Sequence, residues 1–193
     1  MRKHYFLFIV LSIILSSCHN RLENKKLVTS NESMVDVECF FKEKLPLLGH
    51  RNWVIIADMA YPLQTTSGIR TVYSDKGYEQ TLSTVMNIVR SAPHIYAHIY
   101  LDEEQTFLTE DLCPGITTYR EMLKKEIGAE VLTYQPHEKL LNKLDSISRL
   151  YQVIVIKTPL LLPYTSVFFE FDCSYWNAEK EALIVDKRNG TLQ

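Results

Sequence analysis

Glycine and cysteine are both scarce in this chain, with 6 glycines and 4 cysteines among 193 residues. No segment matches the glycine-rich GxGxxG or Walker loops or the GxSxG motif, which argues against the commonest nucleotide-binding and α/β-hydrolase functions. No CxxC pair occurs, so neither a zinc knuckle nor a disulfide framework is indicated. The formal net charge of −2 gives no reason to expect a nucleic-acid partner.

The longest apolar run lies near the start of the chain, from Tyr5 to Leu15, directly after Arg2, Lys3 and His4. A helix needs about 20 apolar residues to cross a bilayer, so this run is too short to span a membrane comfortably. A short positive start followed by an apolar run and small residues is the layout of a secretory signal. Residues 1–17 are therefore predicted to form a cleaved signal peptide.

The four residues that end this segment, Leu-Ser-Ser-Cys at 15–18, resemble the lipobox of bacterial lipoproteins. The resemblance implies that Cys18 is acylated and becomes the first residue of the mature chain. Lipid anchoring would place the protein in the cell envelope, and His19 in place of Asp favours the outer membrane by the same resemblance. The alternative is an ordinary signal peptide with an incidental cysteine.

Residues 18–34 are mostly polar and lack periodicity, which is typical of a flexible tether. The remaining part, 35–193, is long enough for one domain with a sizeable core. Its cysteines Cys39, Cys113 and Cys173 permit one disulfide in an oxidising envelope, but the sequence does not choose the pair.

Helical and strand patterns alternate along this domain. Helices are expected over 35–45, 78–89, 117–127 and 136–147. Strands are expected over 53–57, 95–101, 131–134, 151–157 and 165–171, and 61–68 is expected to be a loop. The alternation predicts an α/β fold, a single domain with a mainly parallel or mixed buried sheet flanked by helices.

An imidazole and a carboxylate, His50 and Asp58, stand at the two ends of the expected strand 53–57. Open α/β sheets bind ligands just beyond the carboxyl ends of their strands, and Asp58 has that position. From spacing alone, the simpler interpretation is that His50 is a surface turn residue and that Asp58 caps the following loop.

Three segments together resemble the RbsD/FucU family, the D-ribose pyranases and L-fucose mutarotases. The segment with His50 and Asp58, GHRNWVIIADMAYP, is similar to the family's opening motif. The segment TYQPHE, with His137, is similar to the strand, turn and helix that carry a second family histidine. The segment PYTSV, with Tyr164, resembles the family's Pro-Tyr-(Ala/Gly)-Asn strand start.

The family resemblance implies an isomerase that opens and recloses the ring of a free sugar, with no cofactor. Proton transfer near neutral pH favours imidazole, whose unperturbed pKa is about 6.5. His50 is therefore expected to be the principal acid/base, and Asp58 to orient it or accept a sugar hydroxyl. His137 and Tyr164 are expected to hold or protonate sugar oxygens. The resemblance also implies a ribose- or fucose-like ligand and a ring-shaped homo-oligomer with sites at subunit contacts.

Two segments depart from the family pattern. The chain has Lys-Thr-Pro-Leu at 157–160 where the family has an Arg-Thr-Gly-Glu type segment, and Ser166 stands where Asn is usual. Lys157 and Ser166 are still candidates for substrate binding, and Trp176 is a candidate for stacking on a sugar. The departures keep open a non-catalytic sugar-binding lipoprotein or a structural one.

His94 and His98 have a spacing that suits a metal pair. Because no third ligand has a recognisable spacing, the favoured interpretation is two half-exposed histidines on an edge or interface strand, without a metal.

Overall fold

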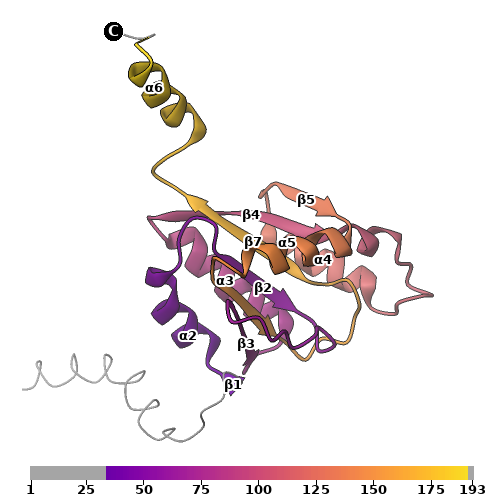
Figure 1. The fold of residues 1–193 in the computed structure, drawn as a ribbon. Coiled ribbons are helices and arrows are strands. Elements are labelled where there is room, and N and C mark those ends of the chain that lie inside the picture. Colours follow the sequence, from indigo (N-terminus) through magenta and orange to yellow (C-terminus); the bar gives the residue numbers. More distant parts are fainter. Residues whose placement is uncertain (1–33, 191–193) are drawn as a thin grey trace, which may run out of the picture. The chain divides into compact units, whose positions relative to one another are not determined.

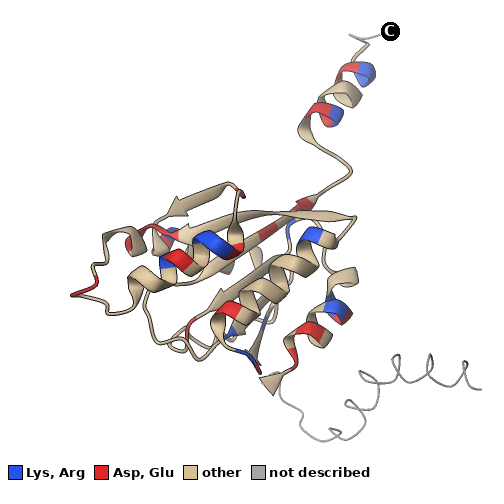
Figure 2. Cartoon of the chain, turned by 180° about the vertical axis from the view of Figure 1, so that it is seen from behind, with Lys and Arg blue, Asp and Glu red and all other residues tan. Residues whose placement is uncertain are grey.

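The computed structural model describes residues 34–190 of the chain. The predicted signal peptide, Cys18 and all but the last residue of the predicted tether lie outside the described residues. Within residues 34–190, no helix is both long and apolar enough to cross a bilayer. Acidic and basic residues are interspersed over the helices (Figure 2).

Seven strands form one mixed sheet (Figure 1). The strands are β1 Met34–Val35, β2 Trp53–Ala57, β3 Ile69–Ser74, β4 Ile95–Asp102, β5 Leu132–Gln135, β6 Val153–Lys157 and β7 Val167–Cys173. Their order across the sheet is β1-β3-β6-β2-β7-β4-β5. All neighbouring pairs are parallel except the two that involve β7. The predicted α/β fold with a mixed sheet is confirmed.

The helices are α2 Val37–Lys44, α3 Tyr78–Ser91, α4 Ile116–Ile127, α5 His137–Ile147 and α6 Ala178–Arg188, with two 3₁₀ segments, η2 Leu45–Leu47 and η3 Glu103–Phe107. The four predicted helices and five predicted strands all form, with small differences at their ends. Strands β1 and β3 and helix α6 were not predicted. The β3 sequence IRTVYS mixes polar with apolar residues directly after a loop, and α6 buries none of its side chains.

Strands β2 and β6 lie in the middle of the sheet, which explains their continuous apolar sequences. On one face, Val54 and Ile56 belong to the core that α2, α3 and α4 cover. On the other face, Trp53 and Ile55 pack with Leu140 and Leu144 of α5. Three helices therefore cover one face, which is turned toward the viewer in Figure 2, and α5 packs on the opposite face.

The direction of strand β7 determines which strand ends, with the polar side chains that follow them, lie at the same edge of the sheet. Strand β7 pairs antiparallel with β2 on one side and with β4 on the other. The parallel strands on both sides of β7 therefore point in the same direction. Strands β2, β4, β5 and β6 all end at one edge of the sheet, which we call the carboxyl edge, and β7 begins there. The opposite edge, where these strands begin, is the amino edge.

Gly68 allows the loop before β3 to pass close to the backbone between α5 and β6. A Cβ atom at this position would lie 1.8 Å from the carbonyl oxygen of Ser148. Because the obstacle is backbone, we expect Gly68→Ala to lower the free energy of unfolding by about 2 kcal/mol or more. Gly49→Ala is the matched control, since its Cβ would meet nothing within 4 Å. Urea unfolding that gives equal stabilities for both variants would contradict this close approach.

Candidate active site

Asp58 directly follows β2 at the carboxyl edge and shapes the loop that comes after it. Its Oδ1 accepts hydrogen bonds from the backbone N–H groups of Ala60 at 2.7 Å and Tyr61 at 3.1 Å. This is the loop-capping arrangement that Asp commonly makes. Within residues 34–190, both hydrogen bonds that Asp58 accepts use Oδ1, so Oδ2 can accept from another donor.

Asp102 and His137 form the central pair of this edge. Because β4 and β5 are parallel and Asp102 is paired with Gln135, the first residue of α5 lies above the end of β4. The His137 Nδ1 is 3.0 Å from Oδ1 of Asp102. The backbone N–H of His137 donates to both carboxylate oxygens of Glu104, at 3.1 and 3.0 Å. Glu104 thereby caps the start of α5 and fixes the backbone of the residue that carries the imidazole.

The electrostatics of this pair follow from burial. The side chain of Asp102 is fully buried, and its Oδ2 has no hydrogen-bond partner within residues 34–190. Burial raises the pKa of Asp102, the bond to His137 opposes the rise, and the nearby charges of Glu104 and Asp58 add to it. The hydrogen bond to Asp102 raises the pKa of His137, against the effect of burial. His137 is therefore a more basic imidazole than usual.

Tyr164 contributes a phenol beside this imidazole. Its ring meets the ring of His137 edge to face, with centroids 5.5 Å apart. Tyr164 has a positive φ of 55°, an uncommon conformation for a residue other than glycine. The next residue holds this turn, because the buried carbonyl of Thr165 accepts hydrogen bonds from the hydroxyls of Tyr78 and Tyr119. The strain is thus fixed by a buried network.

Lys157 ends β6 at the same edge. Its Nζ donates to the backbone carbonyl of Tyr61 at 2.7 Å and so ties the loop after β2 to β6. Thr158 reinforces this link by donating to the carbonyl of Ala57 at 2.9 Å. The observed contact of Lys157 is therefore structural, and its amine lies close to the loop that Asp58 caps.

His50 lies at the amino edge, away from the other three predicted catalytic residues. Within one chain, β2 separates it from Asp58, and a five-residue strand spans roughly 16 Å. The expectation that Asp58 orients His50 is therefore wrong for a single chain. Asp172, near the end of β7, contacts His50 instead, with 2.5 Å between Nδ1 and Oδ1.

The predicted substrate contacts Ser166 and Trp176 also differ from expectation. Ser166 is only 1% exposed, because it leads into the buried strand β7. Trp176 follows the far end of β7, and its indole N–H donates to Glu181 of α6 at 2.8 Å. The chain therefore brings four of the predicted site residues to one edge: Asp58, His137, Lys157 and Tyr164. Ser166 is buried there, and Trp176 lies at the other end of β7.

The two histidines whose spacing suits a metal pair, His94 and His98, have separate partners. His94 Nε2 lies 3.3 and 3.1 Å from the carbonyl oxygens of Leu45 and Leu48. His98 Nε2 lies 3.5 Å from Oδ2 of Asp172. In residues 34–190, no group of three or more His, Cys, Asp or Glu side chains is arranged to hold a metal ion.

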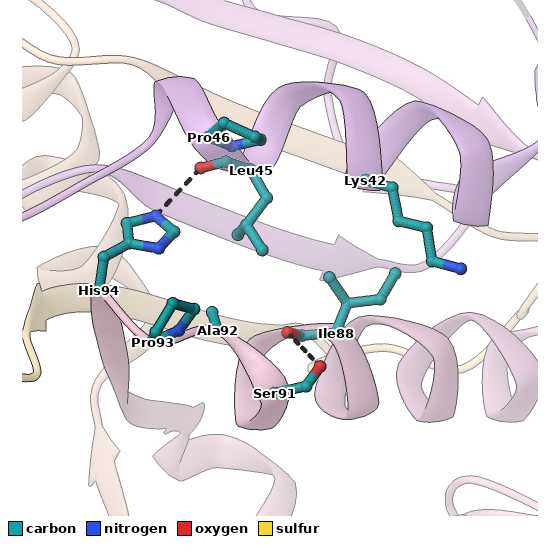
Figure 3. Close-up of a pocket in the computed structure, with 8 residues that line it drawn as sticks. All are labelled: Lys42, Leu45, Pro46, Ile88, Ser91, Ala92, Pro93 and His94. Carbon is teal, nitrogen blue, oxygen red and sulfur yellow. Dashed lines mark hydrogen bonds between the residues drawn. The ribbon is translucent and has the colours of Figure 1, made fainter.

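A groove lies between α2 and α3, with a volume of about 480 Å³ (Figure 3). It is lined by Lys42, Leu45, Pro46, Ile88, Ser91, Ala92, Pro93 and His94. None of the predicted site residues lines this groove. Its lining is mostly apolar, and His94 joins its two sides through the bond to Leu45. The acid/base groups therefore lie elsewhere, at the carboxyl edge.

Asp102 is the main member of the site that sequence reasoning missed. The available signal was its position at the end of the predicted strand 95–101, the same kind of position that singled out Asp58. Together, the four side chains of Asp58, Asp102, His137 and Tyr164 offer an oriented imidazole, two carboxylates and a phenol. Such a set can accept and donate protons and can bind hydroxyl groups.

The Asp102–His137 pair predicts a pH dependence of stability. Because the folded state raises the pKa of His137, its stabilising contribution is fully present below the unfolded value of about 6.5 and is lost as the pH rises through the folded value. We expect the free energy of unfolding to fall more steeply over this window in the wild type than in His137→Gln. Urea unfolding from about pH 5.5 to 8.5 measures it. The exposed variant Lys125→Ala should keep the wild-type slope; equal slopes in all three proteins would contradict the pairing.

Comparison with known proteins finds similar solved structures but no match by sequence. No protein-family model matches the chain, and no curated protein matches it significantly. Bacillus subtilis RbsD, solved with D-ribose, is similar with a TM-score of 0.50 and 17% identity, covering 69% of this chain and 91% of that one. The fucose mutarotase of Streptococcus pneumoniae, solved with L-fucose, has a TM-score of 0.47 and 17% identity, covering 76% and 97%.

FucU from Bifidobacterium longum has a TM-score of 0.47 and 15% identity, covering 69% of this chain and 92% of its own. At such low identities, structural similarity establishes the fold alone. The structural neighbours of this protein are members of the RbsD/FucU family, and the fold that the three sequence motifs imply is confirmed.

Proposed function

We propose that this protein binds a free monosaccharide at the carboxyl edge and interconverts its ring forms. The observation that carries the proposal is the Asp102–His137 pair beside Tyr164. A buried carboxylate fixes the imidazole through Nδ1, and the structure records no hydrogen bond for Nε2 within residues 34–190. An imidazole held in this way is a typical general acid/base.

The chemistry of ring opening matches these groups. A base removes the proton of the anomeric hydroxyl while an acid protonates the ring oxygen. The bond between the anomeric carbon and the ring oxygen then breaks, and an open-chain carbonyl forms. After rotation about the adjacent bond, the reverse transfers close the ring. His137 can exchange a proton at Nε2, the hydroxyl of Tyr164 can donate or accept, and Asp58 Oδ2 can accept from a sugar hydroxyl.

Asp102 supports a polar ligand at the same edge. A buried carboxylate oxygen without a partner is costly, and native proteins rarely keep one without a function. The charge of Asp58 also raises the pKa of Asp102, so the two carboxylates interact electrostatically. Asp102 is fully buried and acts through His137. A ligand rich in hydroxyl groups suits this edge, because hydroxyls donate to the partly exposed carboxylate of Asp58 without adding charge. Ribose- or fucose-like sugars have that chemistry.

His50 enters this proposal through a second copy of the chain. Since His50 lies at the amino edge, it reaches a carboxyl-edge site only where the amino edge of one copy faces the carboxyl edge of the next. Large apolar side chains beside the carboxyl edge support such a contact, with Phe107 73% and Leu161 80% exposed. We therefore propose a homo-oligomer in which His50 of one copy completes the carboxyl-edge site of a neighbouring copy.

A second candidate function is sugar binding without catalysis. Ser166 is buried where the family resemblance would place an amide against the sugar, and Pro159 and Leu160 replace the Gly-Glu pair. Both differences remove groups that could hold the sugar in a reactive position. The acid/base set at the carboxyl edge favours the enzyme over this alternative.

The exchange of sugar anomers tests the catalytic proposal. We expect the full-length chain to accelerate anomeric exchange of fucose, ribose or galactose in saturation-transfer NMR. His137→Ala and Tyr164→Phe should slow it by about tenfold or more, because general acid–base catalysis contributes about 10²–10⁴-fold. Lys125→Ala, on the exposed side of α4, should leave the rate unchanged. Measurable binding without acceleration of any sugar would reject the mutarotase and favour the binding protein; no binding at all would favour a structural protein.

The proposed location is the cell envelope, with a lipid on Cys18 that anchors the protein in the outer membrane, as His19 favours. In a bacterial host, metabolic labelling with an alkyne fatty acid should label the wild type and Cys39→Ser but not Cys18→Ser. Labelling that survives Cys18→Ser would contradict the anchor.

A further inference from the structure

A second histidine–carboxylate pair lies at the amino edge. Oδ1 of Asp172 is hydrogen-bonded to Nδ1 of His50. Oδ2 of Asp172 accepts a hydrogen bond from the hydroxyl of Tyr96 at 3.1 Å. His98 Nε2 lies 3.5 Å from the same Oδ2. The backbone N–H of Cys173 also donates to Oδ1, at 2.7 Å. Asp172 is thus held from several directions before it orients His50.

These contacts keep Asp172 ionised. Burial alone would raise the pKa of Asp172, but the hydrogen bonds from Cys173, His50, Tyr96 and His98 outweigh it and lower the pKa to about 2. An ionised carboxylate only accepts hydrogen bonds. His50 must therefore carry a proton on Nδ1.

Arg51 determines the protonation of the other ring nitrogen of His50, Nε2. Its Nε lies 3.0 Å from Nε2 of His50, and a guanidinium only donates. His50 Nε2 must therefore present a lone pair. The two neighbours together select one neutral tautomer, with the proton on Nδ1 and the basic nitrogen at Nε2.

The contact with Arg51 can open without disturbing the core. His50 and Arg51 are both exposed, and Arg51 also donates from Nη1 to the hydroxyl of Tyr151 at 2.9 Å. A sugar hydroxyl that replaces the Arg51 N–H would donate to the same lone pair. The Asp172 bond would persist, because it lies on the opposite side of the ring.

We propose that Asp172 is a positioning residue that fixes the tautomer of His50, so that Nε2 is the atom that removes the proton of the anomeric hydroxyl. The inference rests on the proposed function, in which His50 serves the site of a neighbouring copy. As Nε2 takes the proton, the Asp172 carboxylate stabilises the imidazolium that forms. The proton returns from Nε2 when the ring recloses. Tyr96 and His98 act one step further away by holding Oδ2.

The test combines a spectroscopic readout with a rate. In the full-length chain labelled with ¹⁵N-histidine, the ring nitrogens of His50 should report the Nδ1–H tautomer in mildly alkaline buffer. In Asp172→Asn, the amide can also donate to Nδ1, so the share of this tautomer should fall and anomeric exchange should slow by about tenfold or more. Asp172→Glu should restore part of both.

Lys125→Ala is the control, because the Lys125 side chain is exposed on α4 and contacts neither Asp172 nor His50. It should keep both the tautomer and the exchange rate near wild type. A His50 that carries its proton on Nε2 in the wild type would overturn the inference. So would an unchanged exchange rate in Asp172→Asn when the tautomer has shifted. A wild type that accelerates no sugar instead rejects the proposed function, whatever tautomer His50 adopts.

Discussion

The antiparallel placement of β7 between β2 and β4 is the constraint on which the site depends. The ladder joins Val54 to Phe169 on one side and Ile99 to Phe169 on the other, so a single buried strand holds both halves of the sheet together. A reversed β4 would place Asp102 at the opposite edge from Asp58. The apolar side chains of β7 thus position polar groups that lie far apart in the sequence.

The same chemical pair occurs twice in this fold, in two different environments. At the carboxyl edge, Asp102 is fully buried and its pKa is raised, while its bond raises the pKa of His137. At the amino edge, Asp172 has four donors and its pKa is lowered to about 2. Burial and hydrogen bonding pull in opposite directions, and the local count of donors decides which of them dominates. Two such edges facing each other in an oligomer would supply one basic and one oriented imidazole.

The sequence was sufficient to predict the alternation of elements, because buried strands such as β2 and amphipathic helices such as α3 have distinct periods. The β3 segment carries a mixed pattern and was missed. The structure places His137 and Tyr164 at one edge, with their rings in contact. Within one chain, His50 does not pair with Asp58, because the two residues lie at opposite ends of the extended strand β2.

The carboxylate partners could not be predicted for a related reason. Asp102 begins the acidic run Asp-Glu-Glu at 102–104, and Asp172 lies next to the last residue of β7. No local motif marks either one as the partner of a histidine. Their roles depend on sheet register, which joins Asp102 to the start of α5 and brings Asp172 next to Tyr96.

The most direct test of the site is a titration of the ¹⁵N-labelled protein with L-fucose and D-ribose, followed by amide NMR shifts. The account predicts the largest changes at residues 58–61, His137 and Tyr164; changes confined to the groove beside His94 would contradict it.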